Sequence, residues 1–128
     1  MRSGFIYIDD NIFPTLLALS EKEQERGLMY QPWKPPNMCF LYSSPRICKF
    51  WMKNTPSPLD IIFSCDGIIH DIHKGEPHST STIGGNNLCD LVIELPFGTA
   101  KDCRIVTGSK VGFIDPDKKE LKKIMSNL

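Results

Sequence analysis

Residues 59–72 read LDIIFSCDGIIHDI, and this stretch decides the fold. Two isoleucine-rich runs, Leu59–Cys65 and Ile68–Ile72, flank the dipeptide Asp66-Gly67. A two-residue hairpin turn needs positive φ at its centre, which aspartate and glycine adopt more easily than other residues. β-Branched residues favour strands because they pack well on a pleated surface. The stretch therefore predicts a β-hairpin within a mostly antiparallel sheet.

Short β-rich segments recur on both sides of this hairpin. They predict further strands at 4–8, 12–18, 38–42, 48–55, 89–95 and 111–114, with a turn at 43–46 and a long polar loop at 76–87. This spacing is typical of a small barrel or sandwich. We expect a mostly β fold with minor α: one antiparallel or mixed, β-barrel-like domain over residues 1–128.

Capping signals predict two or three short helices. Ser20 and Glu23 have the spacing of a capping box, so a helix should run to about Arg26 and end at Gly27 in the left-handed conformation. One helical turn is expected at 98–103. A third helix, over about 116–127, should follow Asp115-Pro116 with one apolar stripe, formed by Leu121, Ile124, Met125 and Leu128.

Composition excludes several classes of protein. The 128 residues carry 15 basic and 15 acidic side chains, so no field of one sign attracts nucleic acid or an anionic membrane. No apolar run approaches the ~20 residues of a membrane span. The apolar start of the chain is too short for a signal peptide, so we expect a cytoplasmic protein. Five cysteines without a C-x-x-C pair suggest neither disulfides nor zinc.

The stretch FWMKNTPSPLD, residues 50–60, leads into the hairpin and mixes aromatic with polar side chains. Trp51 and Lys53 would share one strand face and line a cleft, with Asn54 and Asp60 adding hydrogen-bonding groups. These four residues are the predicted ligand-binding set. In the alternative interpretation, Phe50 and Met52 fill the core while Asn54 and Asp60 tie the bend together. The sequence leaves both open.

Two other groups suggest catalysis or metal binding. Asp60 and Glu94 are strand carboxylates that would do acid–base work if they faced each other across a cleft, although structural roles are commoner. His70 and His73 would point to opposite faces of a strand, with His78 in a loop. We therefore expect solvent-facing histidines, no metal site and no cofactor.

Several motifs together match a known family. They are Glu25-Arg26-Gly27-Leu28-Met29, Met38-x-Phe40, Phe50-Trp51-Met52-Lys53-Asn54-Thr55 with Pro58-Leu59-Asp60 and Phe63, Asp66-Gly67, Glu94-Leu95-Pro96-x-Gly98-Thr99 and Gly108-x-x-Val111. Over about residues 15–114 the chain resembles the domain-of-unknown-function 192 family (DUF192). The resemblance implies a small β-barrel-like domain, often exported in bacteria, and brings no agreed activity or cofactor. The loop at 76–87 differs from the proline-rich loop of that family.

Three functions fit these observations. The preferred hypothesis is a binding or accessory module whose mouth holds a small polar ligand or peptide. The second is a hydrolase that uses Asp60 or Glu94, which the missing nucleophile–base–orienter set disfavours. The third is an accessory protein that presents its C-terminal helix or the 30–36 loop to another protein.

Overall fold

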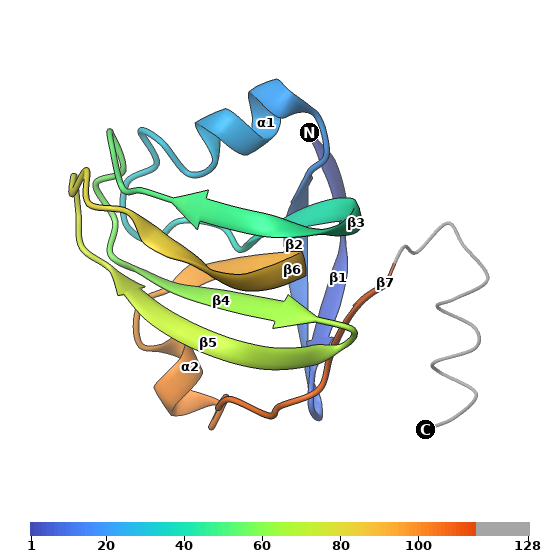
Figure 1. Ribbon diagram of the computed structural model, residues 1–128. Coiled ribbons are helices and arrows are strands. Elements are labelled where there is room, and N and C mark those ends of the chain that lie inside the picture. The colour runs from blue at the N-terminus through green and yellow to red at the C-terminus, as the bar shows by residue number, and fades with distance from the viewer. Residues whose placement is uncertain (115–128) are drawn as a thin grey trace.

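The computed structural model describes residues 1–114, whose seven strands form one sheet (Figure 1). The elements are β1 (Arg2–Ile8), β2 (Asn11–Ala18), α1 (Glu21–Arg26), β3 (Met38–Phe50), β4 (Leu59–Cys65), β5 (Ile68–Gly75), β6 (Ile83–Pro96), α2 (Thr99–Asp102) and β7 (Val111–Ile114). The strand order is β5-β4-β6-β3-β2-β1-β7. Neighbours are antiparallel except β2 and β3. The mostly β, mixed sheet is confirmed, and the helix expected over 116–127 lies outside the described residues.

The sheet curls strongly. In Figure 1, β1 and β2 run across the direction of β3, β6, β4 and β5. The two edges meet at one place, where Ile68 and Lys110 form an isolated antiparallel bridge. Beside it, the Val111 amide donates to the Gly67 carbonyl at 2.9 Å. The sheet is nevertheless not closed, so the expected barrel is not confirmed.

Local sequence signals are confirmed at the hairpin and at the first helix. Asp66 and Gly67 have φ values of 51° and 79° between β4 and β5. The Ser20 hydroxyl accepts from the Glu23 amide, and the Glu23 carboxylate accepts from the Ser20 amide, both at 3.1 Å. Two amides that a helix start would leave unpaired are thereby satisfied, which fixes where α1 begins.

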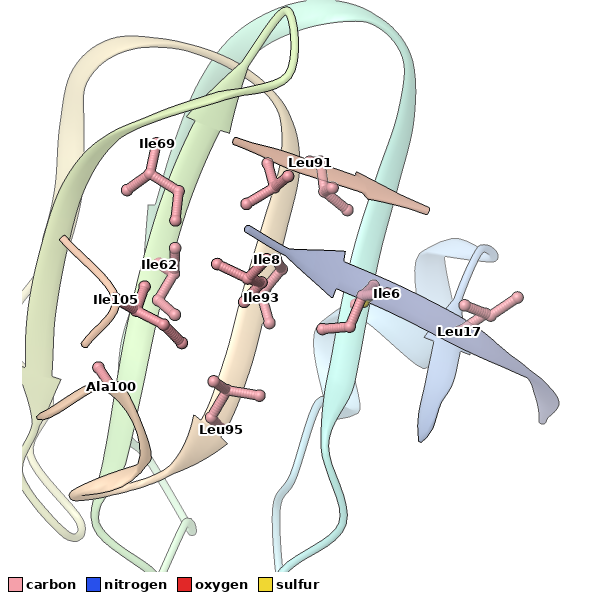
Figure 2. Close-up of a cluster of buried hydrophobic side chains, with 12 residues drawn as sticks. Ile6, Ile8, Leu17, Ile62, Ile69, Leu91, Ile93, Leu95, Ala100 and Ile105 are labelled. Carbon is pink, nitrogen blue, oxygen red and sulfur yellow. The ribbon is translucent and has the colours of Figure 1, made fainter. Parts of the chain in front are cut away.

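The two faces of the sheet bury separate apolar clusters. The first lies inside the curl, where Ile6 and Ile8 of β1 face Ile62 of β4 and Ile93 of β6 (Figure 2). The second lies on the opposite face and includes side chains from connecting segments as well as strands: Ala18, Leu28, Met38, Phe40, Cys48, Met52, Leu59, Ile61, Phe63, Cys89 and Val92. Burial on both faces explains why the central strands are nearly continuous apolar runs.

Three expected segments have other boundaries in the structure. The turn expected at 43–46 lies within β3, which continues to Phe50 because register shifts after Leu41 and Ile47 absorb the extra residues. The strand expected over 48–55 therefore ends early, and the chain turns at Met52–Thr55. The long loop expected at 76–87 is shorter, since β6 begins at Ile83. A Cβ on Gly84 would lie 2.6 Å from the Phe63 ring, so only glycine lets β6 pass there.

Candidate functional site

A pocket of about 200 Å³ opens between α1, β3 and the turn that follows β3. We call it the Glu94 pocket. Its lining residues are Gln24, Glu25, Arg26, Gly27, Leu28, Met29, Phe40, Tyr42, Lys49, Phe50, Trp51, Thr55 and Glu94. All of them except Gln24, Tyr42 and Lys49 belong to the motifs quoted above. The fold thus gathers motifs that are widely separated in sequence around one hollow.

Glu94 is the buried polar group of this pocket. It lies on β6, paired with Met38 of β3 and Ile61 of β4, near the middle of the sheet. Glu94 is only 4% exposed, and no donor within residues 1–114 hydrogen-bonds to its carboxyl. Burial raises the pKa of Glu94 to about 8, because the charged form loses its hydration. The carboxyl is therefore mostly protonated at neutral pH.

Gly27 forms the wall directly beside this carboxyl. It ends α1 at the expected residue, with φ 49° and ψ −129°. The expected left-handed helical conformation is wrong in ψ, but the positive φ is one that glycine adopts far more readily than residues with a Cβ. A Cβ at this position would lie 3.6 Å from Glu94 Oε1 and 3.5 Å from Phe40 Cζ. The backbone of Gly27, at the end of α1, therefore lies beside the Glu94 carboxyl with no side chain between them.

Trp51 stands at the rim of the pocket and Lys53 stands beside it. The indole is 48% exposed, and the Lys53 ammonium lies 5.2 Å from its ring centroid, a cation–π contact. The structure brings the two side chains together on a turn, whereas the sequence predicted a strand. Between them Met52 is fully buried in the second apolar cluster. Lys53 itself does not line the pocket.

Asn54 holds the turn through its backbone. Its φ of 57° is a left-handed value that asparagine tolerates better than most residues, and its carbonyl accepts from the Tyr30 amide at 2.7 Å. On the other side, Met52 donates to Ser79 at 2.8 Å and His78 donates to Thr55 at 3.0 Å. The turn thus joins the segment after α1 to the loop after β5.

Asp60 belongs to the other face of the sheet. It pairs with Leu95, one position from the Glu94–Ile61 pair, and directly paired residues share a face. Its Oδ2 accepts from the amides of Gly98 at 3.1 Å and Ala100 at 2.9 Å, so Asp60 satisfies the start of α2. The hypothesis that Asp60 and Glu94 face one cleft is wrong. Asp60 does not line the Glu94 pocket.

The histidines differ from the prediction because β5 contains an extra residue. The register between β4 and β5 shifts between Phe63 and Ser64, which leaves His70 unpaired in the ladder. His70 and His73 consequently both contact the Phe63 ring, at centroid distances of 6.5 and 5.8 Å. The expectation that these two rings point to opposite faces is wrong, whereas solvent exposure is confirmed for His78 and for the His73 side chain, which is 38% exposed. His73 Nε2 lies 2.7 Å from Asp71 Oδ2, and His70 Nε2 lies 3.4 Å from Cys89 Sγ.

Sequence reasoning missed one cluster of metal-ligating atoms. Cys65, Asp66 and Asp90 place ligand atoms within 4.8 Å of one another. Asp90 Oδ2 also accepts from the Asp66 amide at 3.1 Å, so this carboxylate stabilises the hairpin turn. Only the pairing of β4 with β6 brings residue 90 close to residues 65 and 66. We assign this cluster a structural role.

Cysteine nucleophiles are disfavoured by burial. Desolvation raises the pKa of Cys39 and Cys89 to about 12, and it also raises the pKa of Cys48. A thiol must ionise to act as a nucleophile. These three thiols therefore stay protonated and inert near neutral pH.

A larger cavity of about 490 Å³ lies between β1, β2 and the loop at 34–37. Its walls are mainly proline and apolar side chains, including Phe5, Phe13 and Leu16. Lys34 is the one charged residue among those that line it. Because ligand sites combine apolar walls with a few convergent polar groups, the Glu94 pocket is the better candidate despite its smaller size.

Comparisons with known proteins agree with the fold. The model of the DUF192 family, described as "Uncharacterized ACR", matches residues 6–113. A crystal structure of a "putative transcription regulator" from Sinorhizobium meliloti 1021 has a TM-score of 0.81 and 30% identity, over 88% of this chain and 94% of that one. A protein of unknown function from Novosphingobium aromaticivorans DSM 12444 has a TM-score of 0.79 and 29% identity, over 86% and 84%.

No curated protein sequence matches this chain. Within residues 1–114, no helix has the length and apolar character that crossing a membrane requires. The family match covers most of the chain, including every motif around the Glu94 pocket. The chain belongs to the DUF192 family.

Proposed function

We propose that this domain is a binding module that holds a small polar ligand in the Glu94 pocket. The observation that carries the proposal is the carboxyl of Glu94, which is buried at the pocket without a hydrogen-bond partner in the described chain. Its oxygens reach the pocket and are not sealed in the core, since His70 Nδ1 is the one fully buried side-chain N or O atom without a partner among residues 1–114. The Glu94 carboxyl is therefore open to a donor from a ligand, and such a hydrogen bond would contribute about 1 kcal/mol.

The walls of the pocket support the same function. Phe40, Tyr42, Phe50 and Trp51 supply aromatic surface, while Glu94 supplies a polar group that can orient a ligand. A volume of about 200 Å³ equals that of roughly seven water molecules. The pocket therefore suits a small molecule or a single side chain of a peptide.

The four residues of the predicted ligand-binding set take different roles in this proposal. Trp51 forms the rim, and Lys53 holds the indole and sets the charge at the entrance. Asn54 fixes the turn that carries them, and Asp60 stabilises α2 on the far face of the sheet. Direct contact with the ligand is thus proposed for Trp51 and Glu94.

A fragment screen tests the proposal. The chain has two tryptophans, so Trp33→Phe leaves Trp51 as the only indole and makes its fluorescence a reporter of the pocket. The full chain with this substitution is screened against neutral, cationic and anionic fragments. We expect at least one class to change Trp51 emission in a saturable way.

Two carboxylate substitutions locate the binding site. Glu94→Gln should weaken binding of the active fragments by about tenfold, which corresponds to ~1.4 kcal/mol. Glu76→Gln makes the same chemical change on an exposed loop residue outside the pocket and should leave binding unchanged. A screen without any saturable binder, or hits that Glu94→Gln does not affect, would exclude the proposed function.

A further inference from the structure

The charge and the aromatic surface of the Glu94 pocket indicate which chemical class it binds. We infer that the ligand is a small monoamine, bound as its ammonium ion against the Glu94 carboxylate, and this inference rests on the proposed function. An ammonium group has three donors and no acceptor. It therefore offers both the hydrogen bonds and the opposite charge that a buried acid lacks.

The aromatic rings favour a cation over a neutral ligand. A cation is attracted to the face of an aromatic ring by the ring's quadrupole, most strongly when water is excluded. Two rings of the pocket already bind cations of the protein itself. Lys53 lies over Trp51 and Arg46 lies over Tyr42, each 5.2 Å from the ring centroid. The alkyl part of an amine would meanwhile pack on the rings of Phe40 and Phe50.

The remaining charges restrict the ligand further. Besides Glu94, the titratable or charged residues that line the pocket are Glu25 and Arg26 of α1 and Tyr42 and Lys49 of β3. Arg26 and Lys49 are exposed, so their charges lie towards the rim. A second positive charge on the ligand would be repelled there. A single ammonium group near the base, with a neutral or acidic tail near the rim, fits this arrangement.

Binding should be coupled to one proton. Before binding, the Glu94 carboxyl carries its proton at neutral pH because its pKa is raised to about 8. When an ammonium ion enters, the O–H bond of Glu94 breaks, the proton passes to solvent and the carboxylate pairs with the ammonium. Affinity for the amine should thus rise with pH towards about 8, and fall again when the free amine itself loses its proton near pH ~10.

Three probes of equal length separate the chemical classes: n-butylamine, n-butanol and butyrate. Each is titrated into the full chain carrying Trp33→Phe, with Trp51 fluorescence and calorimetry as readouts. We expect n-butylamine to bind at least about tenfold more tightly than the other two. Glu94→Gln should remove this preference while leaving the weak binding of n-butanol unchanged.

A measurement on the unmutated pocket covers the case in which Glu94→Gln fails to fold. Calorimetry in two buffers of different ionisation enthalpy reports the protons released, and we expect nearly one proton per n-butylamine at neutral pH. Binding without proton release, or equal binding of n-butanol or butyrate, would overturn the amine inference. The fragment screen decides separately whether the pocket binds any ligand, so failure of the amine inference can be distinguished from failure of the proposed function.

Discussion

Asp60 on β4 and Glu94 on β6 point to opposite faces of one sheet, because Asp60 pairs with Leu95 and Glu94 pairs with Ile61. The two carboxyl groups therefore lie on the faces that bury different apolar clusters, and they have different roles. Asp60 is satisfied by two backbone amides, whereas Glu94 has no partner in the described chain. Stability and ligand binding should consequently respond separately to substitutions at these two residues.

The raised pKa of Glu94 predicts that stability falls as pH rises. Between the ordinary value of 4.5 and about 8, the folded state keeps a proton that the unfolded state has lost. The free energy of unfolding should therefore decrease by up to ~1.4 kcal/mol per pH unit in this window. Glu94→Gln should remove this contribution, as urea denaturation at a series of pH values would show. Glu25→Gln, on the exposed helix, is the control that should retain it.

Substitution of Asp60 should cost stability without affecting the pocket. Asp60→Ala leaves the amides of Gly98 and Ala100 without their acceptor, and a loss of ~1–3 kcal/mol is expected. The exposed Asp102→Ala should cost far less. Urea denaturation measures both changes, and fragment binding by the folded Asp60→Ala protein should stay the same. Loss of binding at full stability would instead show that Asp60 contacts the ligand.

Met52 and Lys53, adjacent in the turn after β3, should differ in how much their substitution lowers the stability of the fold. Met52→Ala should destabilise the fold by ~2–5 kcal/mol, because it empties a fully buried position. Lys53→Ala should change the unfolding free energy by no more than ~1 kcal/mol, since it removes one exposed cation–π contact. It should, however, shift the emission of Trp51. Comparable losses from both variants would mean that Lys53 is a structural residue.

Glycines with positive φ should differ in how much stability is lost when alanine replaces them. Gly84→Ala places a Cβ 2.6 Å from Phe63 Cζ and 2.9 Å from the Cys48 carbonyl oxygen. At Gly108, which also has positive φ, an added Cβ meets nothing within 4 Å. Backbone strain alone costs ~1–3 kcal/mol, and we expect Gly84→Ala to exceed Gly108→Ala by a further steric term. Thermal unfolding of the two variants in parallel would test this order.

Features that depend on neighbouring residues could be predicted from the sequence. The Asp66-Gly67 turn and the Ser20–Glu23 capping box need only a few adjacent positions, and both form as expected. Features that depend on a partner strand could not. The extra residue at His70 exists because of how β5 pairs with β4, and no single-strand pattern reveals it. The same holds for β3, whose register shifts carry it through the expected turn.

The candidate site was only partly accessible from the sequence. The motif residues Trp51 and Glu94 stood out, but their common pocket arises from the pairing of β6 with β3 and from the path of the chain after α1. For Asp60 the sequence is compatible with both a ligand-binding and a structural role. Its partners Gly98 and Ala100 are 38 and 40 residues away, beyond the reach of any local pattern.

The parallel pairing of β2 with β3 has a mechanical consequence for the Glu94 pocket. The connection between these strands, residues 19–37, supplies the wall formed by residues 24–29. Both ends of this segment continue into adjacent paired strands, where Leu16 pairs with Met38 and Ala18 pairs with Phe40. The segment is therefore anchored at both ends and cannot move outward by rotation about one end. Its middle is held as well, because the Tyr30 amide donates to the Asn54 carbonyl and the Ser57 hydroxyl donates to the Gln31 carbonyl. The wall that this connection forms is therefore braced along its length, which limits how far the entrance can widen for a larger ligand.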